Sequence, residues 1–432
     1  MYDRLKGFRD VYPEAQTSRR EVTDTVEGAA RRHGFREVNT PRLEDVQMYV
    51  DKSGEGIVDE LYAFEDDGGR SVSLTPELTP TVARMVVARQ QALAKPIKWF
   101  STRPFWRYEQ VQQGRFREFY QTNVDVFGSA EPEADAEVLA VAAAALTDLG
   151  VPASEFEFRV SHRDILCEVL RSFDADVDVT AAVRAVDKSE TVDRAEYLDL
   201  LYEAGLSRDQ AESFDELLAA GDEDLDRLLG AVDSDGLVAA VENLRAVLDA
   251  AADFGVRDHC TVSLRTARGL DYYTGVVFEC FDTEDRVSRA VFGGGRYDDL
   301  IEDFGGQPTP AVGVAPGHAT LSLLLKEAGV WPEEALQTDY YVLTVGDTRA
   351  TAARVARDLR ERGHVVESDV ADRSFGAQMG YADGINAETV VVVGERDLAA
   401  DEVTVKDMES GDQTQVPIEG FPGERPTDDD LT

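Results

Sequence analysis

The stretch from Phe105 to Gly128 carries residue types that could hold a polyanion and a flat ring on one surface. It reads FWRYEQVQQGRFREFYQTNVDVFG and is predicted to form two strands joined by a long polar loop. Because side chains alternate between the faces of a strand, Arg107 and Glu109 are predicted to share one face of the first strand. One face of the second strand is predicted to carry Phe119, Gln121, Asn123 and Asp125.

Positive charge gathers around this polar face. Arg115 and Arg117 follow the loop, so that with Arg107 three arginines are predicted to converge on the ring of Phe119. Guanidinium groups recognise phosphates through paired N–H donors. The alternative is a hairpin whose polar face meets only water, as in many antiparallel sheets. Two further clusters favour a binding surface.

The first of these clusters lies in Ser71–Arg84, SVSLTPELTPTVAR. A strand is predicted to run into Pro76, and a helix is predicted to begin near Thr79 or Thr81. For Thr79 the alternative to a binding role is that of an N-cap of this helix. Glu77 has no such simple structural explanation, which makes it a candidate binding residue.

The second cluster is Arg268–Gly275, RGLDYYTG, where a strand ends and resumes. This order puts a cation and two phenol hydroxyls near one bend. Residues 289–298, RAVFGGGRYD, are predicted to form a strand with a glycine run that lets a backbone or ligand approach closely. The pattern GxxxxGK[ST] is absent from the chain, so no P-loop is predicted.

The composition points to a halophilic protein. The 432 residues include 85 acidic and 44 basic side chains, which give a net charge of −41. Multimolar salt screens such self-repulsion over about 3 Å. An acidic disordered protein and a cation-binding surface are the alternatives, and the 43% hydrophobic content argues against the first.

The cysteines and the apolar runs argue against a disulfide-bonded, secreted or membrane-spanning protein. Cys167, Cys260 and Cys280 are widely spaced without a C-x-x-C pair, so neither a disulfide framework nor a metal site is predicted, and the three are expected to be buried. The N-terminus lacks the apolar core of a signal peptide, and the run 138–146 is too short to span a bilayer. We therefore expect a cytoplasmic protein.

A mixed scaffold is predicted to position these clusters. Helices are predicted at 14–34, 131–149 and 164–170, and residues 173–254 are predicted to be wholly helical, as in an inserted module. From residue 339 the order strand–helix–strand–helix–strand predicts a parallel sheet. No GxGxxG follows its first strand, which disfavours dinucleotide binding.

Taken together, the segments resemble the histidyl-tRNA synthetase family of class II aminoacyl-tRNA synthetases. The matching segments, in the family's order, are KGFRDVYP, HGFREVNTP, LTPELTPTVAR, the hairpin, RGLDYYTG and GGGRYDDL. The resemblance implies an α+β fold: a class II antiparallel sheet flanked by helices with a helical insertion, plus a C-terminal α/β (βαβαβ) domain. The implied catalytic domain has two parts, 1–172 and 255–330, separated by a helical insertion at 173–254. An anticodon-binding domain at 338–420 and an acidic tail at 421–432 follow.

The resemblance also implies roles for individual residues. For ATP, Arg107 would bind the α-phosphate and Glu109 the adenine amino group. Phe119 would stack on the adenine ring, and Arg115 would bind the distal phosphates. For L-histidine, the α-ammonium would be bound by Glu77, Thr79 and Gln121. The imidazole nitrogens would be held by Asp125 and Tyr273, with Tyr272 beside them. Arg268 would stabilise charge on the α-phosphate during attack.

The implied activity is the ATP- and Mg²⁺-dependent charging of tRNA(His) by a homodimer. The sequence departs from the family pattern in two places. Asp125 stands where the family more often has Glu, and Ala319 and Thr320 replace the acidic residue and arginine of the third motif, with His318 nearby. The alternative is a non-catalytic, histidine-sensing regulatory subunit of ATP phosphoribosyltransferase, which the missing arginine favours. Arg268, the tyrosines and the C-terminal domain favour the enzyme.

Overall fold

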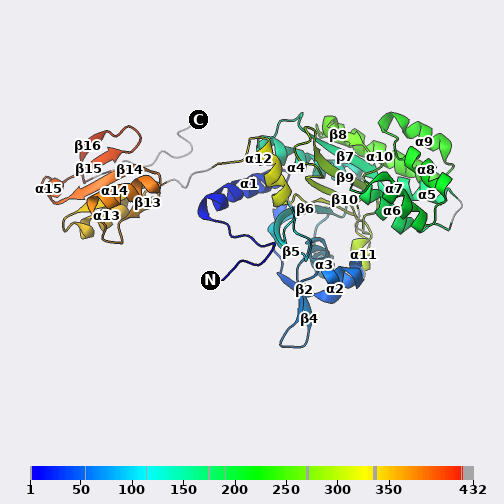
Figure 1. Cartoon of the computed structure of the whole chain (residues 1–432), viewed down its shortest axis with the longest axis horizontal. Helices are drawn as coiled ribbons and strands as arrows, with labels where there is room; N and C mark the ends of the chain where they lie inside the picture. The colour runs from blue at the N-terminus through cyan, green and yellow to red at the C-terminus, as the bar shows by residue number, and fades with distance from the viewer. Residues whose placement is uncertain are drawn as a thin grey trace. The chain divides into compact units, whose positions relative to one another are not determined.

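The computed structural model describes residues 2–53, 55–112, 114–173, 176–189, 191–268, 272–333, 338–419 and 421 (Figure 1). The chain divides into two compact units, Met1–Asp10 with Glu21–Trp331 and Val11–Arg20 with Pro332–Thr432. The acidic tail predicted at 421–432 lies outside the described residues, apart from Phe421. Within the described part of the chain, no helix is long and apolar enough to cross a membrane.

An eight-stranded sheet organises the larger unit, in the order β1-β5-β6-β11-β10-β9-β7-β8. Its strands are β1 (Arg36–Glu37), β5 (Ile97–Trp106), β6 (Glu118–Phe127), β7 (Phe156–His162), β8 (Cys260–Val262), β9 (Val276–Asp282), β10 (Phe292–Arg296) and β11 (Ala311–Val314). The six central strands pair antiparallel, and only the edge pairs β1–β5 and β7–β8 are parallel. The predicted antiparallel sheet is therefore confirmed.

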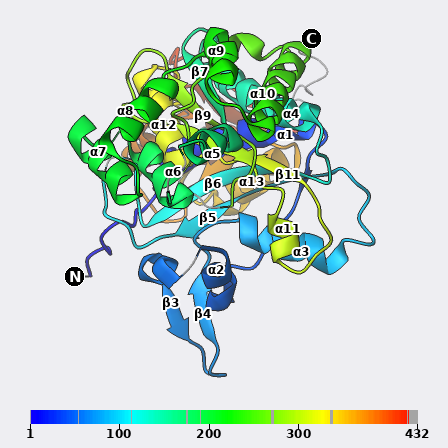
Figure 2. The same ribbon diagram turned by 90° about the vertical axis from the view of Figure 1, so that its right-hand side faces the viewer.

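The two faces of this sheet are covered differently, as Figure 2 shows. One face packs against four helices: α1 (Pro13–Arg32), α4 (Pro132–Asp148), α10 (Asp235–Asp253) and α12 (His318–Glu327). Alanines make up much of α4, and most of that helix is buried, because small side chains let neighbouring elements approach it closely. The other face meets α3 (Thr79–Arg89) and α11 (Leu300–Asp303) around a smaller apolar cluster.

Several helices in the stretch predicted to be wholly helical, 173–254, begin with an acidic or hydroxyl N-cap. The described part of this stretch contains α6 (Val179–Lys188), α7 (Arg194–Glu203), α8 (Arg208–Leu217), α9 (Leu225–Ala231), α10 and the 3-10 helix η2 (Asp222–Asp224). The separately predicted helix at 164–170 is α5 (Arg163–Arg171), which precedes it. The side chains of Asp178, Asp193, Ser207 and Ser234 accept bonds from first-turn N–H groups. Each such cap contributes about 1 kcal/mol. These helices share one apolar cluster with the sheet.

Smaller elements complete the larger unit. A three-stranded sheet in the order β2-β4-β3 is formed by β2 (Leu43–Asp45), β3 (Ala63–Glu65) and β4 (Ser71–Leu74). Short helices lie at α2 (Val46–Ser53), η1 (Glu55–Glu60) and η3 (Arg257–His259). Cys167, Cys260 and Cys280 are buried free thiols, as predicted.

The C-terminal unit contains the predicted parallel strands and an additional hairpin. Strand β12 (Thr338–Val345) pairs in parallel with β13 (Val366–Ser368) and β14 (Ala387–Gly394). Helices α13 (Arg349–Glu361), α14 (Phe375–Gly384) and α15 (Glu395–Leu398) complete this part. The sequence prediction stopped at residue 394 and missed β15 (Glu402–Asp407) and β16 (Gln413–Pro417), which extend the sheet antiparallel.

Candidate active site

The hairpin of β5 and β6 forms the centre of the candidate site. Its ladder runs from Ile97 opposite Phe127 to Trp106 opposite Glu118. Strand β5 ends one residue before Arg107, so the prediction that Arg107 and Glu109 lie within the strand was wrong. The N–H of Tyr108 donates to the carbonyl of Glu60 at 2.8 Å, which takes the chain out of the ladder. Arg107 and Glu109 therefore stand at the open end of the hairpin.

Charged side chains at this open end lie close together. The carboxylate of Glu109 lies between two guanidinium groups, 3.7 Å from Arg107 and 3.8 Å from Arg115. Arg107 also donates from Nε to the carbonyl of Pro76 at 3.0 Å, and its Cζ lies 5.5 Å from the ring centre of Phe119. The four residues predicted to bind ATP thus form one group.

The loop that follows β4 brings Glu77 and Thr79 to the same side. Both side chains are buried, although both are polar. Helix α3 begins at Thr79 and its N-cap is Leu78, so the N-cap explanation of Thr79 was wrong. Burial raises the pKa of Tyr272, and the charges of Tyr273 and Glu77 raise it further. Glu77 is therefore electrostatically coupled to the predicted histidine-binding tyrosines.

Asp125 is a buried carboxyl group on β6 with a partner that the sequence did not reveal. The hydroxyl of Tyr297 donates to its Oδ1 at 2.5 Å. Burial raises the pKa of Asp125 to about 7, while the bond from Tyr297 opposes that rise. A Cβ at Gly313, opposite on β11, would overlap Oδ1. The absence of a side chain there leaves room for this carboxyl group, which titrates near neutral pH.

The glycine run of β10 makes room for two predicted site residues. A Cβ on Gly293 would lie 2.7 Å from Nη1 of Arg268, and one on Gly295 would lie 3.0 Å from Cδ1 of Tyr273. Alternate residues of a strand share a face, so Arg268 and Tyr273 cover the same face of β10. The close approach predicted from these glycines is therefore made by side chains of the chain itself.

Arg268 is held in an unusual conformation over this face. Its φ of 53° lies in the left-handed region, which is uncommon for residues other than glycine and often marks functional sites. Nη1 donates to Oε1 of Glu279 at 2.6 Å. Burial lowers the pKa of Arg268, but Tyr273 and Glu279 raise it by more, so the group stays charged. Residues 269–271 of the same motif lie outside the described residues.

An apolar cluster joins these pieces from underneath. It contains the buried side chains of Leu78, Phe105, Tyr273 and Tyr297, with Phe119 and Tyr272 packed against it. The rings of Tyr272 and Tyr273 lie 4.7 Å apart. On β6, Nε2 of Gln121 donates to Oδ1 of Asn123 at 2.9 Å, which orients both amides along the predicted face. The predicted residues thus converge from three separate segments.

The departure in the third motif lies at the start of α12. Oγ1 of Thr320 donates to the carbonyls of Val291 and Gly317. His318 is buried, and its Nε2 lies 2.9 Å from Oγ1 of Thr122. His318 therefore interacts within the core and does not replace the family's arginine.

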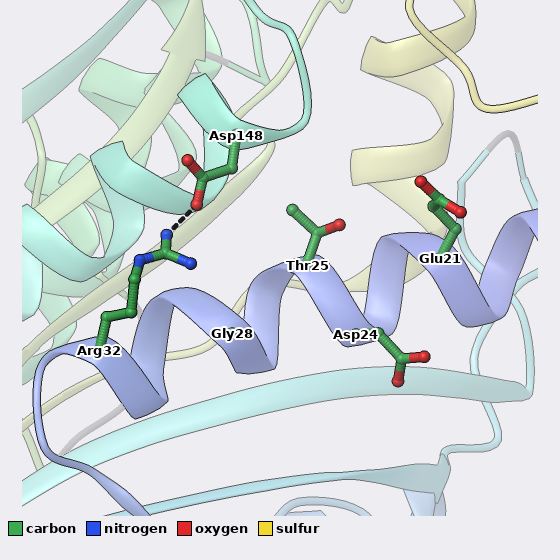
Figure 3. Close-up of a pocket in the computed structure, with 6 residues that line it drawn as sticks. All are labelled: Glu21, Asp24, Thr25, Gly28, Arg32 and Asp148. Atoms are coloured by element: carbon green, nitrogen blue, oxygen red, sulfur yellow. Dashed lines mark hydrogen bonds and ion pairs between the residues drawn. The ribbon is translucent and has the colours of Figure 1, made fainter. Parts of the chain in front are cut away.

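A groove elsewhere in the larger unit is unrelated to these residues. Figure 3 shows it beside α1, where Arg32 pairs with Asp148 of α4. It is lined by Glu21, Asp24, Thr25, Gly28, Arg32 and Asp148. Three of these side chains are acidic, so the groove disfavours a phosphate ligand.

Comparisons with known proteins match both units of the chain to one family of enzymes. A family described as "Histidyl-tRNA synthetase" matches residues 7–321, and an "Anticodon binding domain" matches residues 339–424. Histidine--tRNA ligases from Haloarcula marismortui and Natronomonas pharaonis are 71% and 72% identical to this chain, over all of both chains in each case. The corresponding ligase from Pyrococcus furiosus is 37% identical over 97% of each chain.

Solved structures share the fold. A histidyl-tRNA synthetase from Nostoc sp. PCC 7120 has a TM-score of 0.80 at 23% identity, over 96% of this chain and 97% of its own. A structure titled an ATP phosphoribosyltransferase regulatory subunit/histidyl-tRNA synthetase, from Bacillus halodurans C, has a TM-score of 0.74 at 22% identity, over 91% and 98%. From the family match and the whole-length relatives together, it follows that the chain belongs to the histidyl-tRNA synthetase family.

Proposed function

We propose that the polar face of β6, β10 and β9 is the site at which this chain joins histidine to AMP. The chain is an ATP-dependent ligase that charges tRNA with histidine, as its family and its whole-length relatives establish. The observation that supports the location is that Asp125 and Arg268 lie on one face of the sheet, while Arg107 stands at the open end of the hairpin that carries Asp125. Cations for phosphate and a carboxyl group for imidazole are thus available together.

The proposed reaction starts with L-histidine held by its two ends. Asp125 and Tyr273 bind the imidazole nitrogens, with Tyr272 beside them. The α-ammonium is bound by Glu77, Thr79 and Gln121. A site that hydrogen-bonds both ring nitrogens can reject analogues by ~10⁴-fold without an editing step.

ATP lies at the open end of the hairpin in this proposal. Phe119 stacks on adenine, Glu109 accepts from the adenine amino group, and Arg115 binds the distal phosphates. A carboxylate oxygen of histidine attacks the α-phosphorus and forms the new P–O bond. The bond from phosphorus to the bridging oxygen breaks, and pyrophosphate leaves with the electron pair. Arg107 and Arg268 stabilise the charge that develops on the α-phosphate.

Mg²⁺ is proposed to arrive with the phosphates of ATP. Such ions keep several water ligands and need only one or two carboxylates in addition to phosphate oxygens. Glu279, which is partly exposed on the same sheet face beside Arg268, fits that requirement. When bound, the ion would neutralise phosphate charge.

The remaining parts of the proposal concern partners and organisation. We assign 1–172 and 255–330 to catalysis, 173–254 to a helical insertion and 338–420 to the anticodon of tRNA(His). We also propose a cytoplasmic homodimer. The relatives identical at 71% and 72% are ligases, which favours the enzyme over a regulatory subunit of ATP phosphoribosyltransferase.

Pyrophosphate exchange into ATP tests the location of the site. In molar KCl, the purified chain should exchange pyrophosphate only when histidine is present, and Asp125→Ala should raise the KM for histidine more than the KM for ATP. An unchanged histidine KM in that variant would contradict the assignment of this face.

A further inference from the structure

Arg289 is a positively charged residue near the candidate site. Neither the sequence motifs nor the proposed reaction gives Arg289 a role. It lies in the stretch before β10 and is partly buried. Within the described part of the chain, no hydrogen bond or ion pair involves its guanidinium. Two other partly or fully buried arginines of this unit are paired with carboxylates: Arg268 bonds to Glu279, and Arg296 to Asp135. Arg103 bonds instead to the hydroxyl of Thr75.

Arg289 lies close to Thr320, the residue that stands where the third motif of the family has an arginine. Gly114, in the hairpin loop, is bordered by both side chains: a Cβ there would overlap Nη2 of Arg289 and would lie 3.3 Å from Cγ2 of Thr320. Its φ of 71° also favours glycine. The guanidinium of Arg289 therefore lies beside the residue that stands where the family has an arginine.

The local electrostatics indicate an anion as the missing partner. Burial lowers the pKa of Arg289, the charge of Arg115 lowers it further, and Glu109 opposes the shift. Glu109 is already shared between Arg107 and Arg115. Arg289 thus adds a third positive charge near two guanidinium groups that already share one carboxylate, although the chain as a whole carries a net charge of −41. An excess of cations in such a place suits a polyphosphate.

We propose that Arg289 binds the β- and γ-phosphates of ATP and supplies from the stretch before β10 the cation that Thr320 does not provide. This inference rests on the proposed location of the ATP site. Arg289 and Arg115 hold the leaving pyrophosphate from two sides, while Arg107 and Arg268 remain at the α-phosphate. The missing arginine of the third motif, on α12, is thereby replaced by a residue from the stretch before β10.

The central test compares ligands with and without distal phosphates. Arg289→Ala should raise the KM for ATP and the inhibition constant of pyrophosphate by about 10-fold or more, the loss of one charge-assisted contact. Inhibition by AMP and the KM for histidine should stay within about twofold, because neither ligand has distal phosphates. The matched control is Arg208→Ala, which removes an arginine whose side chain is 80% exposed on α8 and should leave all four constants unchanged.

A second variant asks whether the two positions serve the same phosphates. Adding Thr320→Arg to Arg289→Ala should restore most of the ATP affinity, because the new side chain borders the same glycine. An ATP KM that is unchanged in Arg289→Ala would overturn the proposal. An equal loss of affinity for AMP, histidine and ATP would also overturn it, because it would indicate a structural role for Arg289. A double variant that recovers no ATP affinity would overturn it as well. Absence of exchange in the wild-type chain would instead contradict the proposed function.

Discussion

The hydrogen bond between Tyr297 and Asp125 gives a quantitative prediction for histidine binding. Tyr297→Phe removes the hydroxyl that donates to Oδ1 of Asp125 at 2.5 Å. A hydrogen bond to a charged group contributes about 1.5–3 kcal/mol. At 1.36 kcal/mol per pKa unit, its loss should raise the pKa of Asp125 by roughly 1–2 units. The pKa rises because the hydrogen bond from Tyr297 stabilises the charged carboxylate, and an interaction that stabilises the charged form of an acid lowers its pKa. Removing the bond therefore has the opposite effect.

The consequence is a shift in the pH profile of histidine binding. Burial already raises the pKa of Asp125 to about 7, so the carboxylate that accepts from the imidazole is present only above that pH. In Tyr297→Phe the same dependence should move to roughly pH 8–9. At pH 7.5 the KM for histidine should then rise roughly 3- to 25-fold. The substrate's own imidazole titrates identically in both proteins and cancels in the comparison.

The assay is pyrophosphate exchange at constant molar KCl from pH 6 to 9.5, with histidine varied at saturating ATP. The matched control is Tyr381→Phe, which removes a tyrosine hydroxyl donating to Glu367 at 3.0 Å in the C-terminal unit. That variant should keep the wild-type profile. A Tyr297→Phe profile with the wild-type midpoint would refute both the role of this bond and the assignment of Asp125 to the imidazole.

Three further predictions test other parts of the site. Arg268→Ala should slow adenylate formation by at least ~10²-fold in single-turnover assays, whereas the histidine affinity measured by calorimetry should persist, because the charge of Arg268 acts mainly in the transition state. A parallel loss of histidine affinity would make Arg268 a binding or structural residue. Gly293→Ala should slow the same step because its Cβ would lie 2.7 Å from Nη1 of Arg268 and 2.8 Å from the carbonyl of Phe278, and a wild-type rate would contradict that packing. Aminoacylation should rise with KCl into the molar range as the Debye length falls from about 10 Å at 0.1 M to 3 Å at 1 M; a maximum near ~0.1 M would overturn the halophilic interpretation.

Local patterns predicted the elements more reliably than their ends. The alternation of polar and apolar residues placed Gln121 and Asp125 correctly on one face of β6. The end of β5 was misplaced because it depends on a contact between Tyr108 and Glu60, which are distant in sequence. The hairpin of β15 and β16 was missed because both strands are largely polar: only Val403 and Val405 alternate in β15, and β16 has one apolar side chain besides its proline.

Partners distant in sequence were beyond sequence reasoning. Tyr297 lies 172 residues from Asp125, and its motif was read only for its glycines. Glu279 stands outside every recognised motif, and Arg289 was read only as the start of the glycine-run strand. Their positions become clear only from the neighbouring strands and the hairpin loop. Family patterns supplied the residue types of the site, whereas the tertiary fold supplied their charge partners.

A crystal structure with histidine and a non-hydrolysable ATP analogue is the most direct test of the site proposed on this sheet face. We predict an imidazole nitrogen within ~3 Å of Asp125 and the α-phosphate between Arg107 and Arg268, at hydrogen-bonding distance. The distal phosphates should contact Arg115 and Arg289. Ligands bound anywhere else, for example in the groove of Figure 3, would contradict the assignment.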